Sequence, residues 1–355
     1  MSSRLAKLRE ALDANDLDAI VITQPENRRY ISGFTGSSAL LLVSMEHALL
    51  ATDFRYYEQV GKQSPDFRLI KVESNETGPI LNNMVQETQT TRVGFECQHV
   101  TVDTHKLWAD AAEGFELVPS KEIIETIRAT KDQNELATIR RAVALSDGAI
   151  HYIRDVIRPG MTEKEIAWEM ESYMRTHGAD QLAFPIIAAA GPNGAMPHAV
   201  PSDRAILTGE PIVMDLGARV DGYNSDLTRT ICIGEPDDKY REVYDIVLKA
   251  QLAAEEAIRP GMQGKEADAV ARKVITEAGY GEYFGHGLGH GVGLAVHEKP
   301  NAGKTSEDML LRGSVVTVEP GIYIPGWGGV RIEDMVVVTD DGVEILSQAA
   351  KDPIV

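Results

Sequence analysis

The sequence predicts an α/β amino-terminal domain built on a mixed sheet, followed by an α+β domain with an internal duplication. The chain has 355 residues, which exceeds the roughly 250 to 300 residues that one hydrophobic core usually serves. Short apolar runs alternate with helical patterns in the first third of the chain, and a five-residue phrase recurs in the remainder. We therefore expect two domains, residues 1–126 and 127–355.

The amino-terminal domain begins with an amphipathic helical pattern, SSRLAKLREALDAN. Five apolar runs follow that are typical of strands: DAIVI, SALLLVS, ALLAT, RLIKV and RVGFE. Gly33 and Gly36 mark a turn ahead of the second run. These patterns by themselves indicate no chemistry for this half.

The composition, with 43% hydrophobic and 25% charged residues, is that of a globular chain. The net charge of −19 argues against nucleic acid or an anionic membrane surface as a partner. A well-solvated surface or adaptation to salt explains most of this acidity. The amphipathic start has no apolar signal region, and no apolar run approaches the length of a membrane span, so we expect a soluble, cytoplasmic protein. Cys97 and Cys232 lie in apolar strand-like runs, which predicts buried free thiols.

The second domain begins in a long helical stretch, IIETIRATKDQNELATIRRAVALSDGAIHYIRDVI, which we expect to be interrupted near Lys131. The phrase IRPGM then occurs at Ile157–Met161 and again at Ile258–Met262. Helical runs flank both copies, which predicts two similar halves that share a sheet. The alternative is that Pro-Gly merely punctuates two unrelated helix starts.

Two aspartates are brought together by a predicted hairpin. Asp221 and Gly222 lie between two strand patterns and form a two-residue turn signal. In the register of this turn Asp226 faces Gly217, two residues from Asp215, so both carboxylates project to one side of the sheet. On a buried face this pair is unfavourable unless a cation or a proton intervenes, which favours a metal ion. Two exposed acids near a turn are the alternative.

A glycine-rich segment, FGHGLGHGVGLAVHE, carries three histidines. Its glycines alternate from Gly285 to Gly293, and each would cost about 1 kcal/mol in a helix relative to alanine. His286 and His290 are therefore not a helical zinc pair, and the backbone can approach a ligand or metal closely. One histidine alone is more often structural, but this short segment holds three of the nine histidines in the chain, His286, His290 and His297. This clustering favours a functional loop.

A second pair of acids follows in SVVTVEPGIYIPGWGGVRIEDMVVV, where Glu319 ends one strand run and Glu333 lies early in the next. The layout repeats that of the aspartate hairpin. Four carboxylates and one imidazole match two divalent cations in charge, and they suit manganese, cobalt or iron better than a thiolate-preferring metal. Two such ions roughly 3.5 to 4 Å apart would lower the pKa of a shared water. Metal-assisted hydrolysis is the predicted chemistry.

The sequence resembles a known family through the motifs PHAVPSDR, MDLGARVDGYNSDLTRT, HGLGHGVGLAVHE, VEPGIY and RIED, with YISGFTGS and TDFRYYEQ before them. It is similar to the metal-dependent proline peptidases of the pita-bread fold, peptidase family M24, along nearly the whole chain. The resemblance implies a creatinase-like amino-terminal domain and a pita-bread catalytic domain that holds two divalent ions, with manganese first and cobalt, iron or zinc as alternatives. The implied metal ligands are Asp215, Asp226, His290, Glu319 and Glu333.

The resemblance also implies catalytic roles. His198 in the PHAVP loop would hydrogen-bond the tetrahedral intermediate, and His297 would contact the scissile carbonyl or the proline. Glu319 would act as the general base and pass the proton to the leaving nitrogen.

Two further residues, His286 and Arg331, are implied on the substrate side of the site. His286 would line the proline pocket. Arg331 would also orient the carboxylates of Glu333 and Asp226. For both residues a purely structural role is the alternative.

The implied activity is release of the amino-terminal residue from peptides with proline in the second position. The main prediction is an Xaa-Pro aminopeptidase, and the alternative is a prolidase restricted to dipeptides. A methionine aminopeptidase shares the five ligands but usually lacks the amino-terminal domain. A lyase of the same fold would show altered ligands, and a non-catalytic peptide-binding protein would lack ligands or His198. The family resemblance further implies a homodimer.

Overall fold

The computed structural model describes residues 3–73 and 76–355. The chain divides into two compact units, Met1–Arg128 and Ala129–Val355. Within the described ranges, no helix combines the length and the apolar character needed to cross a membrane.

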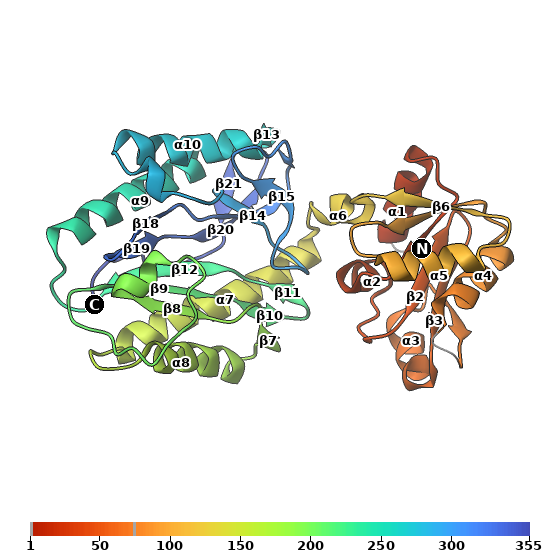
Figure 1. The fold of residues 1–355 in the computed structure, drawn as a ribbon, viewed down its shortest axis with the longest axis horizontal. Coiled ribbons are helices and arrows are strands. Elements are labelled where there is room, and N and C mark those ends of the chain that lie inside the picture. Colours follow the sequence, from red (N-terminus) through yellow and green to blue (C-terminus); the bar gives the residue numbers. More distant parts are fainter. Residues whose placement is uncertain (1–2, 74–75) are drawn as a thin grey trace. The chain divides into compact units, whose positions relative to one another are not determined.

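The amino-terminal unit is built on a six-stranded sheet with the order β4-β3-β2-β1-β5-β6 (Figure 1). β1 runs parallel to β5 and antiparallel to β2, so the prediction of a mixed sheet is confirmed. The strands are β1 (Ala19–Ile22), β2 (Leu40–Ser44), β3 (Ala48–Thr52), β4 (Arg68–Lys71), β5 (Arg92–Glu96) and β6 (Glu116–Ser120). The five predicted runs are all strands, and β6 is an additional edge strand.

Helices pack on this sheet and complete its core. They are α1 (Ser3–Ala14), α2 (Pro25–Ser32), α3 (Tyr57–Gln63), α4 (Thr77–Thr88), α5 (Val102–Ala111) and α6 (Ile123–Arg128). Trp108 of α5 is buried with the apolar side chains of β1, β2, β3 and α4.

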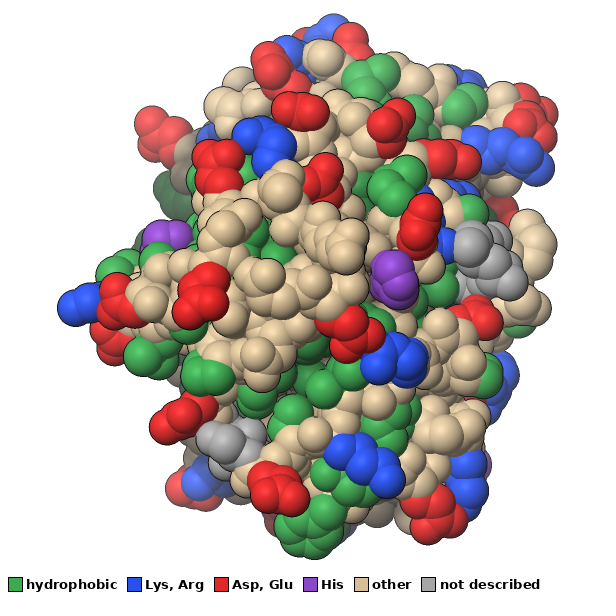
Figure 2. Space-filling view, turned by 90° about the vertical axis from the view of Figure 1, so that its right-hand side faces the viewer, with side chains coloured by type: hydrophobic (Ala, Val, Ile, Leu, Met, Phe, Trp, Pro, Cys, Tyr) green, Lys and Arg blue, Asp and Glu red, His purple; other side chains and the backbone are tan. Residues whose placement is uncertain are grey.

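Cys97 directly follows β5 and is exposed, so the prediction of a buried thiol is wrong there, whereas Cys232 is buried as predicted. On the face shown in Figure 2, acidic side chains are scattered among basic ones.

The carboxy-terminal unit contains two pairs of helices on opposite sides of its strands (Figure 1). They are α7 (Gln133–Val156), α8 (Glu163–Thr176), α9 (Asp238–Ala257) and α10 (Gly264–Glu277). α7 packs against α8, and α9 against α10. The predicted interruption near Lys131 is confirmed, because α6 ends at Arg128 and α7 begins at Gln133.

The two IRPGM phrases have matching conformations, which confirms the internal duplication. Gly160 and Gly261 adopt φ values of 92° and 87°, a region that favours glycine. The amide of Gly160 donates to the carbonyl of Ile206 at 3.0 Å, and that of Gly261 to the carbonyl of Leu310 at 2.8 Å. Each following helix, α8 and α10, begins with a capping box. Unrelated Pro-Gly turns would not share this set of contacts.

The strands of this unit form several short sheets. In the first half they are β7 (Gln181–Leu182), β8 (Ile187–Ala190), β9 (Pro211–Leu216), β10 (Ala218–Val220), β11 (Tyr223–Asn224) and β12 (Leu227–Cys232). In the second half they are β13 (Met262–Gln263), β14 (Gly289–Gly291), β15 (Glu298–Ala302), β16 (Met309–Leu310), β17 (Val315–Val318), β18 (Gly321–Ile324), β19 (Gly328–Arg331), β20 (Asp334–Val338) and β21 (Val343–Ile345). The orders β12-β9-β8 and β15-β14-β17-β20-β21 describe the main sheet of each half.

Hydrogen bonds join the two halves at β12. The amide of Glu333 donates to the carbonyl of Thr228 at 3.1 Å, and the amide of Arg331 donates to the hydroxyl of Thr230 at 3.1 Å. The segments that carry the predicted acids of the two halves therefore meet at β12.

A buried charged cluster lies behind this junction. Arg229 pairs with Asp334 at 2.7 Å, and both side chains are almost fully buried. Lys351 pairs with the other oxygen of Asp334 at 2.5 Å and thereby attaches the end of the chain to β20. Glu255 of α9 lies beside this cluster, and one of its carboxylate oxygens is buried without a hydrogen bond within the described residues. Burial and the neighbouring Asp334 raise the pKa of Glu255 to about 8.

This raised pKa predicts how Glu255 affects stability. Native Glu255 keeps its proton to higher pH than in the unfolded chain, so folding loses stability as the pH rises from 4.5 to about 8. Glu255→Gln removes that loss. At pH 8.5 the free energy of unfolding of the variant should exceed that of the wild type by about 1 to 3 kcal/mol. Urea unfolding of chelator-treated protein measures the difference, which should shrink toward pH 4.5. A wild type more stable than the variant at pH 8.5 would contradict the prediction.

Candidate metal centre and active site

The aspartate hairpin has the register predicted from its turn. Asp221 and Gly222 both adopt positive φ values, 45° and 76°, as a type I′ turn requires. Thr228 pairs with Asp215 across β9 and β12, which leaves Asp226 opposite Gly217. The two aspartates therefore lie diagonally on one face of the hairpin.

Helix α7 holds this hairpin in place. The hydroxyl of Ser146 lies 2.8 Å from that of Ser225, and the hydroxyl of Tyr223 donates to the Glu135 carboxylate at 2.8 Å. Both contacts are buried. A Cβ at Gly217 would overlap the carbonyl oxygen of Ser225, so this position admits only glycine in the observed backbone.

The two glutamates also lie opposite each other, but four short strands replace the two predicted runs. Each predicted run is split at its glutamate, into β17 and β18 at Glu319 and into β19 and β20 at Glu333. Val318 pairs with Asp334, and Gly321 pairs with Arg331, so Glu319 faces Glu333. Pro320 lacks an amide hydrogen and interrupts the ladder beside Glu319.

The structure brings the five predicted metal ligands together. One ligand oxygen from each of Asp215, Asp226 and Glu333 lies within 4.8 Å of the others. The Nε2 atom of His290 lies 3.7 Å from Asp226 Oδ2 and 3.3 Å from Glu319 Oε1. Residues from β9, from the segment before β12, from β14 and from the ends of β17 and β20 thus converge on one point.

The electrostatics of this cluster fit bound cations. Burial, followed by the neighbouring carboxylates, raises the pKa values of Asp226 and Glu333 well above their usual range. Burial also raises the pKa of Glu319 and lowers that of His290. Asp215 Oδ1 is buried and accepts no hydrogen bond from the described residues. Carboxylates that repel one another, an oxygen without a donor and a neutral imidazole are a donor set suited to divalent ions.

Arg331 contacts different carboxylates from those expected. Its Nη2 atom donates to Asp215 Oδ2 at 2.6 Å, whereas the prediction paired it with Glu333 and Asp226. It reaches Glu333 indirectly, because its Nε atom donates to the Thr228 hydroxyl, which donates to Glu333 at 2.6 Å. Thr228 faces Asp215 in the hairpin register, and this pairing directs the guanidinium to the Asp215 side.

The histidines lie around the carboxylate cluster. His198 and His286 line a cavity of about 300 Å³ together with Tyr323. The Nε2 atom of His286 lies 2.9 Å from the Tyr323 hydroxyl, which accepts from Arg331 at 2.9 Å. The His297 ring lies 4.2 Å from that of His290, centroid to centroid. Burial lowers the pKa of His286. Partial desolvation and the neighbouring His290 lower the pKa of His297.

The glycine-rich loop is irregular rather than helical, as predicted, and α10 supports its first part. Asp268 accepts from the amide of Leu288 at 3.0 Å and pairs with Arg272. Arg272 donates to the carbonyls of Phe284 and His286 at 2.9 and 2.7 Å. These contacts fix the backbone on the approach to His290.

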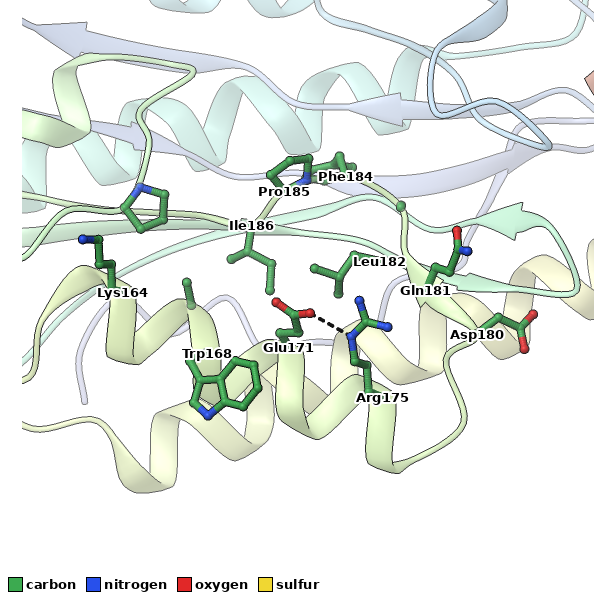
Figure 3. Close-up of a pocket in the computed structure, with 13 residues that line it drawn as sticks. Lys164, Trp168, Glu171, Arg175, Asp180, Gln181, Leu182, Phe184, Pro185 and Ile186 are labelled. Atoms are coloured by element: carbon green, nitrogen blue, oxygen red, sulfur yellow. Dashed lines mark hydrogen bonds and ion pairs between the residues drawn. The ribbon is translucent and has the colours of Figure 1, made fainter. Parts of the chain in front are cut away.

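A second hollow lies between α8 and the segment 180–186 (Figure 3). It measures about 760 Å³. Trp168, Leu182, Phe184 and Ile186 line it, and an ion pair of Glu171 with Arg175 lies beside them. Its lining residues include none of the predicted site residues.

Three supporting residues were not predicted from the sequence. Thr228 and Tyr323 link Arg331 to Glu333 and to His286. Asn224 contacts the glycine-rich loop. Thr228 lies two residues after Asp226, Tyr323 lies four residues after Glu319, and Asn224 lies two residues before Asp226. Spacing alone does not show which side chains these residues contact.

Comparisons with known proteins identify the family. Residues 137–340 match metallopeptidase family M24, and residues 4–130 match the Creatinase/Prolidase N-terminal domain. The chain is 38% identical to an Xaa-Pro dipeptidase of Pyrococcus furiosus over 99% of both chains. It therefore belongs to metallopeptidase family M24, and the predicted class, a metallo-exopeptidase of the pita-bread fold, is confirmed.

Solved structures give the same fold. An Xaa-Pro dipeptidase from Bacillus anthracis matches with a TM-score of 0.96 and 41% identity over 99% of both chains. An X-Pro aminopeptidase from Thermotoga maritima matches with a TM-score of 0.90 and 37% identity over 98% of this chain and 100% of that one.

The repulsion within the cluster predicts how Asp226→Asn behaves. Without metal, the variant should unfold at the same temperature as the wild type or up to roughly 4 °C higher, because one buried like charge is removed. Manganese should raise the melting temperature of the wild type and have much less effect on the variant. Thermal unfolding with chelator and with manganese measures both effects.

Asp221→Asn is the matched control, since it changes an exposed aspartate in the same hairpin. It should respond to manganese as the wild type does. A response of Asp226→Asn equal to that of the control would show that Asp226 does not bind the metal.

Proposed function

We propose that this protein is an Xaa-Pro dipeptidase that uses two divalent ions held by Asp215, Asp226, His290, Glu319 and Glu333. The observation that carries the proposal is the convergence of these five side chains in a chain of family M24. The dipeptidases of Pyrococcus furiosus and Bacillus anthracis support the substrate class. They favour the dipeptidase alternative over the aminopeptidase that was our main prediction.

The ligand set determines the chemistry that this site suits. Two divalent ions, when bound, would supply an activated water and polarise the scissile carbonyl. Oxygen-rich ligation with a single imidazole favours manganese, with cobalt, iron and zinc as alternatives. We assign catalysis to residues 127–355, and a homodimer remains a prediction from the family resemblance.

Glu319 is the proposed general base. Its carboxylate accepts from the Thr317 hydroxyl at 3.0 Å and lies beside His290. A carboxylate in this position can take a proton from the attacking water and release it to the leaving proline nitrogen.

The histidines are the proposed contacts to the substrate. His198 is exposed at the cavity and can donate a hydrogen bond to the oxyanion. His297, beside His290, can contact the scissile carbonyl or the proline. His286 lines the cavity with Tyr323, which makes this cavity the proposed proline site. Arg331 is enclosed behind Asp215 and Tyr323, so its proposed contribution to substrate binding is to hold these two residues.

An Xaa-Pro aminopeptidase is the second candidate. The Thermotoga maritima structure, an X-Pro aminopeptidase, is 37% identical to this chain. The two activities differ in whether a residue can follow the proline.

Hydrolysis of a matched pair of peptides, Xaa-Pro and Xaa-Pro-Xaa, tests the proposal. Protein stripped with a chelator and reloaded with manganese, cobalt or zinc should cleave the dipeptide, with kcat/KM for the tripeptide lower by about a hundredfold or more. Comparable cleavage of both peptides would establish the aminopeptidase. Cleavage of neither with any metal would overturn the assignment to proline peptides.

The role of His198 predicts a loss in turnover. His198→Ala should lower kcat by roughly 10²- to 10³-fold, because an oxyanion donor acts in the transition state. Metal affinity should stay unchanged, since His198 is not one of the five proposed ligands. His151→Ala, which changes an exposed histidine of α7, is the control and should retain full activity. Loss of metal binding in His198→Ala would contradict the assigned role.

A further inference from the structure

We propose that Asn224 is a positioning residue for His297, acting through the loop that joins His290 to His297. The inference rests on the proposed function, because it adds a residue to that site rather than a new reaction. Asn224 ends β11, two residues before Asp226, and its side chain is buried.

Asn224 makes three hydrogen bonds to two consecutive peptide groups of the loop. Its backbone amide donates to the carbonyl of Gly293 at 2.9 Å. Its side-chain Nδ2 atom donates to the carbonyls of Gly293 and Leu294, each at 3.0 Å. The two donors of one amide group are thus both directed at the middle of the loop.

The loop has little regular pairing of its own at this point. It lies between β14 and β15, whose register shifts between Gly289 and Gly291. Residues 292–297 form no strand. A side chain that binds the carbonyls in the middle of this segment therefore restricts a backbone that the β ladder leaves unpaired.

Glu298 supports the same loop from its far end. Its carboxylate accepts from the amide of Ala295 at 3.1 Å and pairs with Lys131 at 2.9 Å, and both charged side chains are almost fully buried. A Cβ at Gly293 would overlap this carboxylate, so the loop closes tightly around it. Asn224 holds the carbonyls of the loop, and Glu298 holds one of its amides.

The geometry assigns the effect to His297 rather than to His290. The amide of His290 donates to the Thr317 hydroxyl at 3.0 Å, and Gly291 pairs with Val316, so β14 fixes His290 without Asn224. His297 lies three residues after Leu294, at the end of the unpaired segment and directly before Glu298, where pairing with Gly291 resumes. A shift at Gly293 and Leu294 would therefore move His297 more than His290.

The contact also joins the two halves of the duplication. Asn224 belongs to the aspartate hairpin of the first half, and the loop belongs to the second. The hydrogen bonds of Asn224 thereby tie the backbone beside Asp226 to the loop that carries His297. Reacting groups must be held within a fraction of an ångström for full activity, and a small misplacement can lower the rate severely.

Asn224→Ala in the metal-loaded, full-length enzyme tests the proposal. Its kcat on Xaa-Pro should fall about tenfold or more, because His297 is misplaced in the transition state. KM and metal affinity, measured by chelator competition, should stay within about threefold. In the His297→Ala background, Asn224→Ala should lower kcat by less than about twofold further, since the two residues act as one unit.

A second readout does not depend on activity. In metal-free protein, hydrogen exchange at residues 292–297 should be faster in Asn224→Ala than in the wild type, with exchange in β17 unchanged. Asn224→Ser, which also lacks the two amide donors but keeps a polar group, should show the same pattern if Asn224→Ala is too unstable to assay.

Asn27→Ala is the control for loss of a buried amide. Asn27 lies in the amino-terminal unit and donates to the carboxylates of Glu96 and Glu125. This variant should lose stability and keep its kcat.

Three results would overturn the proposal. They are a wild-type kcat in Asn224→Ala, a double variant in which the falls in kcat of Asn224→Ala and His297→Ala multiply, and a loss of metal affinity above tenfold in Asn224→Ala. If the wild type itself cleaves no Xaa-Pro peptide, the proposed function fails instead. The exchange experiment still tests whether Asn224 holds the loop.

Discussion

Repulsion among buried carboxylates is the constraint on which the carboxy-terminal unit depends. Burial raises the pKa values of Asp226, Glu333 and Glu319, and the neighbouring carboxylates raise those of Asp226 and Glu333 further, so the metal-free cluster is electrostatically unfavourable. Arg331 balances only part of this charge, through Asp215. A fold that holds these groups together gains stability when cations bind, because cations bind the native state and not the dispersed acids of the unfolded chain.

The duplication explains how one chain gathers these groups. Each half contributes a helix pair and a hairpin that carries two of the acids, and β12 joins the halves through the backbone of Glu333. Contacts behind the site keep this junction rigid, including the buried pair of Arg229 with Asp334. Rigid support matters because ligands that could relax apart would lose their affinity for metal.

Local signals in the sequence predicted much of this structure. The Asp221-Gly222 turn fixes the register of Asp215 and Asp226 within a dozen residues, and the structure has that register. Long-range choices were not predictable in the same way. Arg331 selects Asp215 through the position of Thr228, and Asn224 reaches a loop about 70 residues away, contacts that depend on how the two halves meet. The catalytic roles of the histidines came from family resemblance and remain predictions.

The most direct test is anomalous diffraction at the manganese edge from crystals of chelator-treated protein soaked in manganese. We expect two peaks within the cluster, in contact with the carboxylates of Asp215, Asp226, Glu319 and Glu333, and one of them beside His290. A single peak, or manganese bound only outside these residues, would contradict a two-metal site.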